Sequence, residues 1–230
     1  MRAYDAVIFD LGGIVTAYDP MRFALEILHD HEQADQVRRL VFGTKTWLAL
    51  DQGLLTEKEA EARITAENPE YADAIHAVFD LYKNLLVPIP EGIAIVQKVK
   101  DAGYRALALS NFGPEAWEVV RRRDMYGDLF DGLVISSQEK LVKPDPAIFE
   151  VLLERYGLEP KRCIFIDDFP ANVEAARHLG IDSIHWPHIP RRAGKRKADG
   201  QPLRSQPGTW VGLLPSSKPP LSRAGPGLSP

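Results

Sequence analysis

Polar side chains that can act as acids, nucleophiles or hydrogen-bond donors follow three short apolar segments of this chain. Asp10 comes directly after one apolar run and just before two glycines. Ser110 and Asn111 end a second run, and the adjacent acids Asp167 and Asp168 end a third. Runs of this length that stop at turn residues predict buried strands. Because ligands bind at the carboxyl ends of the strands in an open α/β sheet, we expect these groups to meet at one edge.

These groups, together with Lys143 shortly before a predicted helix start, match the needs of phosphoryl transfer. A phosphoryl group in transfer spreads negative charge over its oxygens, so catalysis depends on positioned donors and cations. The Lys143 ammonium and the Ser110 hydroxyl are such donors, and a carboxylate such as Asp10 can attack phosphorus directly. The acids at 167 and 168 repel each other unless a hard divalent cation lies beside them.

Taken in order along the chain, these four motifs resemble those of the haloacid dehalogenase superfamily of hydrolases, most of whose members are phosphatases. The resemblance covers residues 4 to about 186 and is closest to the branch with soluble epoxide hydrolase amino-terminal domains and sugar-1-phosphate phosphatases. It implies that Asp10 is the nucleophile of an aspartyl-phosphate and that Ser110 and Lys143 are its catalytic partners. The groups expected to contact the substrate are Ser110, Asn111, Lys143 and Gly12.

The late acid pair is expected to bind magnesium. A carboxylate that attacks an anionic phosphate needs a cation to offset the repulsion, and Mg²⁺ binds few carboxylates together with several waters. We therefore predict Mg²⁺ as the cofactor. The expected ligands are Asp10, the backbone carbonyl of Gly12 and one or both of Asp167 and Asp168.

Gly12 departs from the pattern that the resemblance implies. Most phosphatases of the superfamily carry a second Asp two residues after the nucleophile, as the general acid for the leaving group. Its loss removes a contribution of about 10²–10⁴-fold in rate. The glycine therefore favours an easier leaving group, such as the hemiacetal oxygen of a sugar 1-phosphate or an acyl phosphate. Tyr18 and Asp19 are the nearest substitutes, although both stand where a helix is predicted to begin.

Two other functions are compatible with this glycine. Hydrolytic dehalogenases of the superfamily also lack the acid, attack carbon and use no metal. A catalytically silent binding module that retains the fold is the other alternative. We favour a phosphatase of a small phosphorylated metabolite, such as a sugar phosphate, because a metal-free anion site has little use for two extra carboxylates.

The pattern of elements predicts an α/β fold, a doubly wound parallel sheet of the Rossmann-like haloacid dehalogenase type, because helices and strands alternate after residue 87. We assign residues 1–18 and 87–189 to a catalytic core and 19–86 to a small inserted helical cap that can close on a substrate. The segment 47–53 resembles the cap loop that faces the site in related enzymes. Trp47 is equally well explained as an anchor of the cap's own core.

Composition is that of an ordinary globular protein, with 230 residues, 45% hydrophobic and 26% charged. The chain begins with charged residues and has no apolar run long enough to cross a bilayer, so we expect no membrane partner. The single cysteine, Cys163, excludes an internal disulfide and is expected to be a buried small hydrophobe. A reducing, cytoplasmic location is the resulting expectation.

Residues 190–230 differ from the rest of the chain. They contain eight Lys or Arg against one acid, with eight prolines, six glycines and five serines. Such a segment cannot bury enough apolar surface to offset the entropy of ordering, so we expect a disordered tail. Its basic cluster at 191–197 is expected to be solvated rather than bound to nucleic acid, which makes nucleic acid an unlikely partner.

Overall fold

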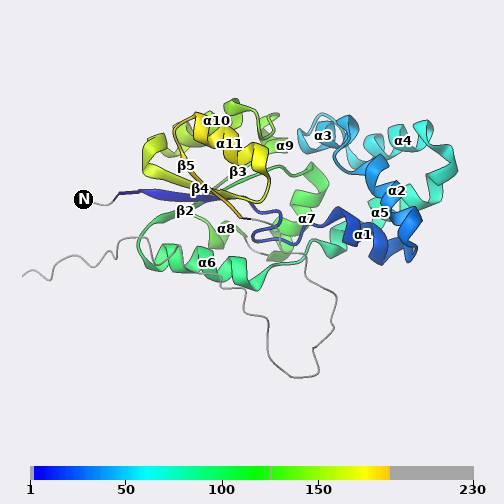
Figure 1. The fold of residues 1–230 in the computed structure, drawn as a ribbon, viewed down its shortest axis with the longest axis horizontal. Helices are drawn as coiled ribbons and strands as arrows, with labels where there is room; N and C mark the ends of the chain where they lie inside the picture. Colours follow the sequence, from blue (N-terminus) through cyan, green and yellow to red (C-terminus); the bar gives the residue numbers. More distant parts are fainter. Residues whose placement is uncertain (1–2, 125, 187–230) are drawn as a thin grey trace, which may run out of the picture.

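A computed structural model describes residues 3–124 and 126–186. At its centre is a sheet of five parallel strands in the order β3-β2-β1-β4-β5 (Figure 1). The strands are β1 (Ala6–Phe9), β2 (Arg105–Ser110), β3 (Gly132–Ile135), β4 (Cys163–Asp167) and β5 (Asp182–His185). The predicted doubly wound α/β fold is therefore confirmed.

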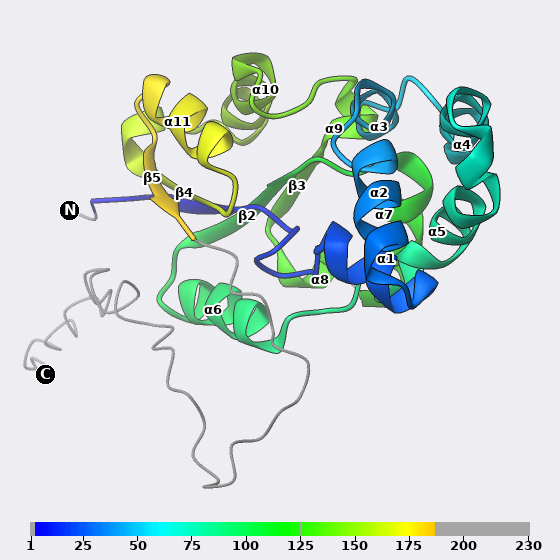
Figure 2. The ribbon, with the colours of Figure 1, turned by 45° about the vertical axis from the view of Figure 1, so that its right-hand side comes forward.

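Helices cover both faces of this sheet, as Figures 1 and 2 show. Val7 and Phe9 of β1 pack into the apolar core on the side of α6 and α7, whereas Ala6 and Ile8 pack into the core under α10 and α11. Successive residues of a strand point to opposite faces, so a strand buried on both sides must be apolar throughout. From residue 90 onward the helices are α6 (Pro90–Asp101), α7 (Pro114–Asp124), α8 (Tyr126–Leu129), α9 (Ser136–Glu139), α10 (Pro146–Tyr156) and α11 (Pro170–His178), with a 3₁₀ turn, η2 (Pro160–Arg162).

Five helices lie between β1 and α6 and pack together beside the sheet (Figure 2). We call them the inserted helices. They are α1 (Pro20–Leu28), α2 (His31–Val41), α3 (Lys45–Asp51), α4 (Glu57–Glu67) and α5 (Ala72–Leu85), with a 3₁₀ turn, η1 (Pro69–Tyr71). Asp19 caps α1 with Pro20 in the first turn, and Thr56 and Glu59 form a capping box at the start of α4.

Trp47 belongs to an aromatic core of the inserted helices. It is 5% exposed, and its ring centroid lies 4.5 Å from that of Phe42 and 5.4 Å from that of Tyr82. Such tilted and edge-on contacts stabilise a small core beyond the area that they bury. Trp47 is therefore an anchor of this core, as one of the two interpretations of the sequence expected.

Register brings the polar strand ends to one edge. Phe9 of β1 pairs with Ala108 of β2 and with Ile166 of β4, so Asp10 is level with the ends of both neighbours. Since β1 lies between β2 and β4, this edge is where the chain reverses its direction across the sheet, the usual ligand-binding position in such folds.

Differences from the sequence predictions are confined to short elements. The turns of helix at α8 and α9 were not predicted, because four-residue helices carry no periodic apolar pattern. Cys163 is fully buried, as expected. Among the described residues, no helix has the length and apolar character needed to span a membrane. The expected disordered tail at 190–230 lies outside the described residues.

Candidate active site

Asp10 is at the centre of a buried polar cluster at the carboxyl edge of the sheet. Its Oδ1 accepts hydrogen bonds from Ser110 Oγ at 2.7 Å and from the Leu11 backbone N–H at 2.7 Å. Lys143 Nζ lies 3.0 Å from the same oxygen. The hydroxyl and ammonium predicted to act with Asp10 are thus brought into direct contact with it.

Lys143 connects two of the acids. Its side chain is almost fully buried, and Nζ donates to Asp167 Oδ2 at 2.7 Å as well as pairing with Asp10. Burial lowers the pKa of this lysine, but attraction to Asp10 and Asp167 outweighs it and holds the pKa above its ordinary value. The lysine therefore remains an ammonium ion between two carboxylates.

Asp167 is fully buried, and both of its carboxylate oxygens accept hydrogen bonds from the protein. Oδ1 accepts from the Phe169 backbone N–H at 2.7 Å, and the Asn172 side-chain amide donates to Oδ1 and Oδ2 at 3.1 and 3.0 Å. With the lysine contact, Asp167 has a complete set of partners. Asn172 therefore orients this carboxylate.

Asp168 is less enclosed than Asp167 and lies against the loop after β1. A Cβ atom built on Gly13 would come 2.1 Å from Asp168 Oδ2, and Gly13 has a φ of +71°. Both facts require glycine at position 13, since other residues rarely adopt positive φ. The loop backbone and the Asp168 carboxylate therefore fit closely together.

The carboxylates of Asp10, Asp167 and Asp168 form one cluster, with a ligand oxygen from each within 4.8 Å of the others. Burial raises the pKa of Asp10 to about 7, and repulsion from the other two acids adds to the effect. Burial and then repulsion from Asp167 raise the pKa of Asp168 to about 6. Three acids against one lysine leave excess negative charge, which is the donor set that a hard divalent cation requires.

Asn111 is bound to the backbone of Lys143. Its Oδ1 accepts from the Lys143 backbone N–H at 2.8 Å, and its Nδ2 donates to the Lys143 carbonyl at 3.0 Å. Both ends of the amide are therefore engaged with the chain itself. The side chain therefore positions Lys143.

The loop around Gly12 has space for a side chain. A Cβ there would lie 3.5 Å from Tyr18 Cβ, an ordinary contact distance. Burial raises the pKa of Tyr18 far above its ordinary value, which makes this phenol a poor acid. Asp19 accepts from the Arg22 backbone N–H at 3.1 Å as the cap of α1. Neither residue is a suitable replacement for the missing acid.

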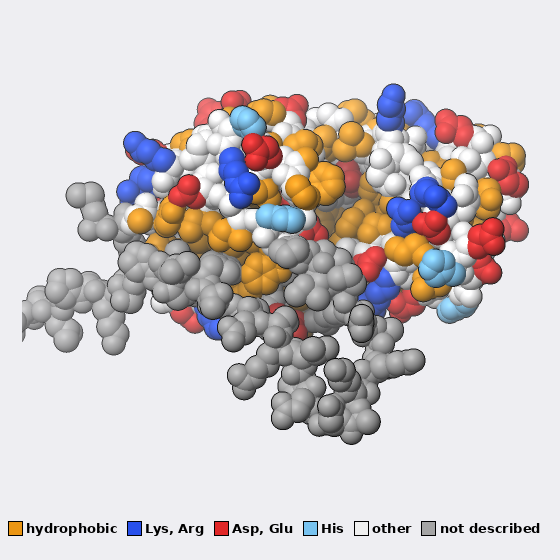
Figure 3. All heavy atoms as spheres, viewed as in Figure 1, with side chains coloured by type: hydrophobic (Ala, Val, Ile, Leu, Met, Phe, Trp, Pro, Cys, Tyr) orange, Lys and Arg blue, Asp and Glu red, His pale blue; other side chains and the backbone are white. Residues whose placement is uncertain are grey.

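The inserted helices contact the core beside this cluster. Ser136 Oγ donates to the Asp51 carbonyl, and Gln52 Nε2 donates to the Lys140 carbonyl at 2.7 Å. Figure 3 shows a hollow in the surface between the inserted helices and the helices around the sheet, with hydrophobic side chains along it. The segment 47–53 thus contacts the core through Asp51 and Gln52.

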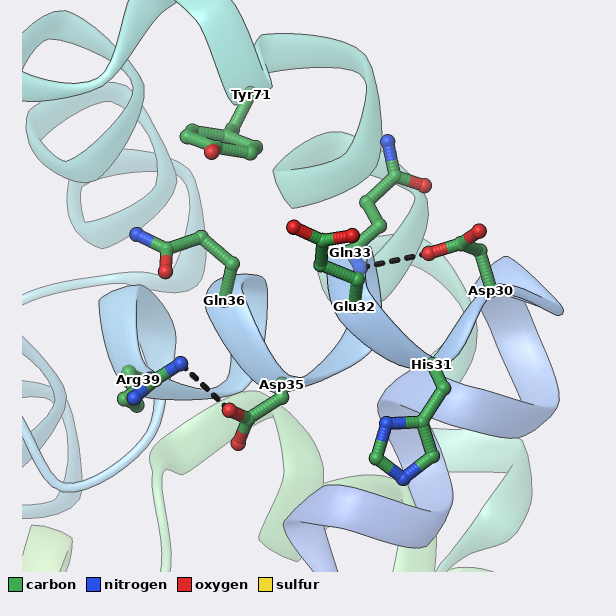
Figure 4. Close-up of a pocket in the computed structure, with 8 residues that line it drawn as sticks. All are labelled: Asp30, His31, Glu32, Gln33, Asp35, Gln36, Arg39 and Tyr71. Atoms are coloured by element: carbon green, nitrogen blue, oxygen red, sulfur yellow. Dashed lines mark hydrogen bonds and ion pairs between the residues drawn. The ribbon is translucent and has the colours of Figure 1, made fainter.

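A separate pocket of about 680 Å³ opens on the inserted helices (Figure 4). Its lining includes Asp30, which caps α2, and Asp35, which pairs with Arg39 at 2.5 Å. These polar groups are used within α2 itself. The pocket contains none of the residues that the sequence marked for chemistry.

Comparison with known proteins agrees with this geometry. The sequence model of the haloacid dehalogenase-like hydrolases matches residues 4–180. The chain belongs to this family. It is accordingly an enzyme, a hydrolase.

Three similar proteins illustrate the range of the family. A phosphorylated carbohydrates phosphatase of Thermotoga maritima is 29% identical over 79% of this chain and 84% of its own length. Acyl-CoA dehydrogenase family member 10 of Mus musculus is 27% identical over 80% of this chain, which spans only 18% of that protein. A family enzyme of Bacteroides thetaiotaomicron, solved with magnesium and inorganic phosphate, has a TM-score of 0.64 at 24% identity and covers 79% of this chain and 93% of its own.

Proposed function

We propose that this hydrolase is a Mg²⁺-dependent phosphatase that acts on a small phosphorylated metabolite through an aspartyl-phosphate at Asp10. The observation that carries the proposal is the position of Lys143 Nζ, which lies 3.0 Å from Asp10 and 2.7 Å from Asp167. A buried ammonium beside a buried carboxylate offers a cation to the oxygens of a bound phosphoryl group at the point of attack.

Asp10 is suited to be the nucleophile because its hydrogen bonds are one-sided. Ser110, the Leu11 N–H and Lys143 all contact Oδ1. Oδ2 is then the oxygen that attacks phosphorus, while the donors on Oδ1 hold the carboxylate in place. Ser110 and Lys143 are also close enough to Asp10 to contact phosphoryl oxygens when a substrate binds.

A magnesium ion fits the three-carboxylate cluster. Asp10, the Gly12 carbonyl and one or both of Asp167 and Asp168 are the groups we assign as its ligands. When bound, the ion offsets repulsion between Asp10 and the phosphate and polarises the phosphoryl group. Asp167 also holds Lys143 in place through its Oδ2.

The inserted helices are proposed to be the cap of the enzyme, residues 19–86, with 1–18 and 87–189 as its core. Contacts at Asp51, Gln52 and Gly53 hold them against the core beside the site. A cap in this position excludes water and selects the leaving group. The Thermotoga relative, a phosphorylated carbohydrates phosphatase, supports a sugar phosphate as the substrate.

The alternative function is that of a metal-independent dehalogenase, which the glycine at position 12 favours because halide needs no proton. Such an enzyme must attract an anionic haloacid to a site with three carboxylates and one lysine. Without a bound metal ion, the excess negative charge of this site repels the haloacid. The acid pair therefore favours phosphate chemistry.

Phosphate release from sugar phosphates, acyl phosphates and nucleotides, with a 2-haloacid as control substrate, tests the proposal. We expect release with Mg²⁺ and none with EDTA, and loss on the order of 10⁴-fold or more for Asp10→Asn. The matched control is Asp19→Asn, whose carboxylate caps α1. Halide release that survives EDTA would identify the dehalogenase instead, and a folded chain inactive on every substrate would indicate a silent binding module.

A further inference from the structure

The glycine at position 12 leaves the leaving oxygen without a proton donor from the loop after β1, and another carboxyl group lies close by. We propose that Asp51, the last residue of α3, is the general acid and base of this site. It donates a proton to the leaving oxygen and afterwards accepts one from the attacking water. This inference rests on the phosphatase function proposed above.

Hydrogen bonds fix Asp51 beside the loop that follows β2. Ser136 Oγ donates to the Asp51 carbonyl and accepts from the Phe112 backbone N–H at 2.9 Å. Hydrogen bonding from the Gly113 backbone acts on the Asp51 carboxyl itself. Gly113 is three residues beyond Ser110, the residue whose hydroxyl contacts the nucleophile. The Asp51 carboxyl also interacts electrostatically with Asp10 and Lys143, which places it beside the cluster.

The residues next to Asp51 lock this position. Gln52 Nε2 donates to the Lys140 carbonyl at 2.7 Å, and Lys140 Nζ donates to the Gly53 carbonyl. Gly53 has a φ of +69°, and a Cβ there would lie 2.5 Å from the Ser137 carbonyl oxygen. The turn after α3 thus fits against the core so closely that only glycine is accommodated. The contacts that dock the inserted helices on the core therefore also fix the position of Asp51.

The charges around Asp51 suit proton transfer. Burial is the largest effect and raises its pKa to about 7, hydrogen bonds from Gly113 and Trp47 act the other way, Asp10 raises the pKa and Lys143 lowers it. The other titratable groups that face it, Tyr18 and Tyr82, have raised pKa values and stay neutral. An acid–base group works best when its pKa is near the working pH, and Asp51 meets this condition where Tyr18 does not.

The reaction balances with Asp51 alone. As Asp10 Oδ2 forms a bond to phosphorus, the bond from phosphorus to the leaving oxygen breaks and that oxygen takes the Asp51 proton. Water then attacks the phosphorus of the aspartyl-phosphate and gives its proton to the Asp51 carboxylate. The bond from phosphorus to Asp10 breaks, which restores the nucleophile and the protonated acid.

Substrates with different leaving groups separate this role from a structural one. We expect Asp51→Asn to lower kcat/KM about 100-fold or more for an alkyl phosphate, whose leaving oxygen needs a proton. For p-nitrophenyl phosphate, whose leaving group departs as an anion, kcat/KM should change less than about threefold. A burst of p-nitrophenol should also appear. For this substrate kcat/KM reports the steps up to departure of the leaving group, which need no acid, whereas the later attack of water on the aspartyl-phosphate has lost its base and becomes slow.

Two further variants complete the test. Asp80→Asn makes the same chemical change at an exposed position of α5 and should leave kcat/KM unchanged for both substrates. Gly12→Asp in the Asp51→Asn background should restore activity toward the alkyl phosphate. The new carboxyl can supply the proton, and a Cβ at Gly12 has only ordinary contacts. Circular dichroism establishes that each variant is folded. If Asp51→Asn does not fold, the wild-type enzyme serves instead. Its kcat/KM for the alkyl phosphate divided by its kcat/KM for p-nitrophenyl phosphate should fall as the pH rises through about 7, because Asp51 loses the proton that it donates.

Equal loss for both substrates, or no loss for either, would overturn the inference and leave Asp51 as a structural residue. A wild-type ratio that is constant with pH would do the same. A wild-type chain that hydrolyses neither substrate in Mg²⁺ would instead contradict the proposed phosphatase function. The two failures are therefore distinguishable.

Discussion

The side-chain amide of Asn111 bonds to both the N–H and the carbonyl of Lys143, at 2.8 and 3.0 Å. This double contact ties the end of β2 to the loop that carries the lysine, 32 residues later in the chain. Lys143 in turn holds Asp10 and Asp167. One amide therefore sets the position of the only ammonium that contacts the acid cluster in the described part of the chain.

Removal of this amide should affect activity and stability together. We expect Asn111→Ala to lower the free energy of unfolding by about 1–3 kcal/mol, because two partly buried backbone groups lose their partner. Displacement of Lys143 should lower kcat/KM about 10- to 100-fold, which corresponds to about 1.4–2.8 kcal/mol of transition-state stabilisation. Urea titration and phosphate release measure the two effects.

Asn68→Ala is a matched control, since Asn68 Nδ2 donates to the Ile64 carbonyl at 2.9 Å within the inserted helices. It should lower stability and leave kcat/KM unchanged. Full activity in Asn111→Ala would show that Lys143 keeps its position without the amide.

The two adjacent glycines after the nucleophile should respond differently to alanine. Gly13→Ala places a Cβ against the Asp168 carboxylate at a positive φ, so we expect a loss of at least about 1–2 kcal/mol in stability. Gly12→Ala meets only ordinary contacts and should change stability by less than about 0.5 kcal/mol. Chemical denaturation of both variants checks this, and equal effects would contradict the fit of Asp168 against the loop.

Binding of Mg²⁺ should stabilise the folded chain. A ligand that binds only the folded state adds about 2.7 kcal/mol at a concentration 100 times its Kd. Wild type should therefore show a higher Tm with saturating Mg²⁺ than with EDTA, and Asp168→Asn should lose most of this shift. Differential scanning fluorimetry measures it. A shift that Asp168→Asn leaves intact would remove Asp168 from the set of ligands.

The stability of the metal-free chain should depend on the protonation of Asp168. Its pKa in the folded chain is raised to about 6 from an ordinary value of 3.8. The folded state therefore holds this proton more tightly than the unfolded state. The resulting stabilisation is complete below about pH 4 and is lost as the pH rises through about 6.

In EDTA we expect Asp168→Asn to flatten the decrease in Tm between pH 4 and 6, because the amide cannot lose a proton. Asp80→Asn, at an exposed position, should follow the wild-type profile. Thermal melts across this pH range test the claim. Parallel profiles for wild type and Asp168→Asn would contradict it.

Local patterns determined the fold and the order of the chemical groups. Apolar runs that end in Asp10, Ser110 and Asp167 predicted three adjacent strand ends, because burial on both faces demands apolar residues throughout. The side chains of Thr56 and Asp145 cap the starts of α4 and α10, and such contacts span only a few residues. Information of this kind lies within one turn or one strand and is readable in the sequence.

Tertiary structure alone decided which of these groups are free to act. The sequence could not reveal that Asn111 is bound to the Lys143 backbone, that Asp167 has all its partners, or that Asp51 lies at the rim of the site. These contacts join segments that are distant along the chain, and they depend on how the inserted helices and the core pack. No local periodicity encodes such distances, so the carboxyl that we assign as proton donor appears only once the chain is folded.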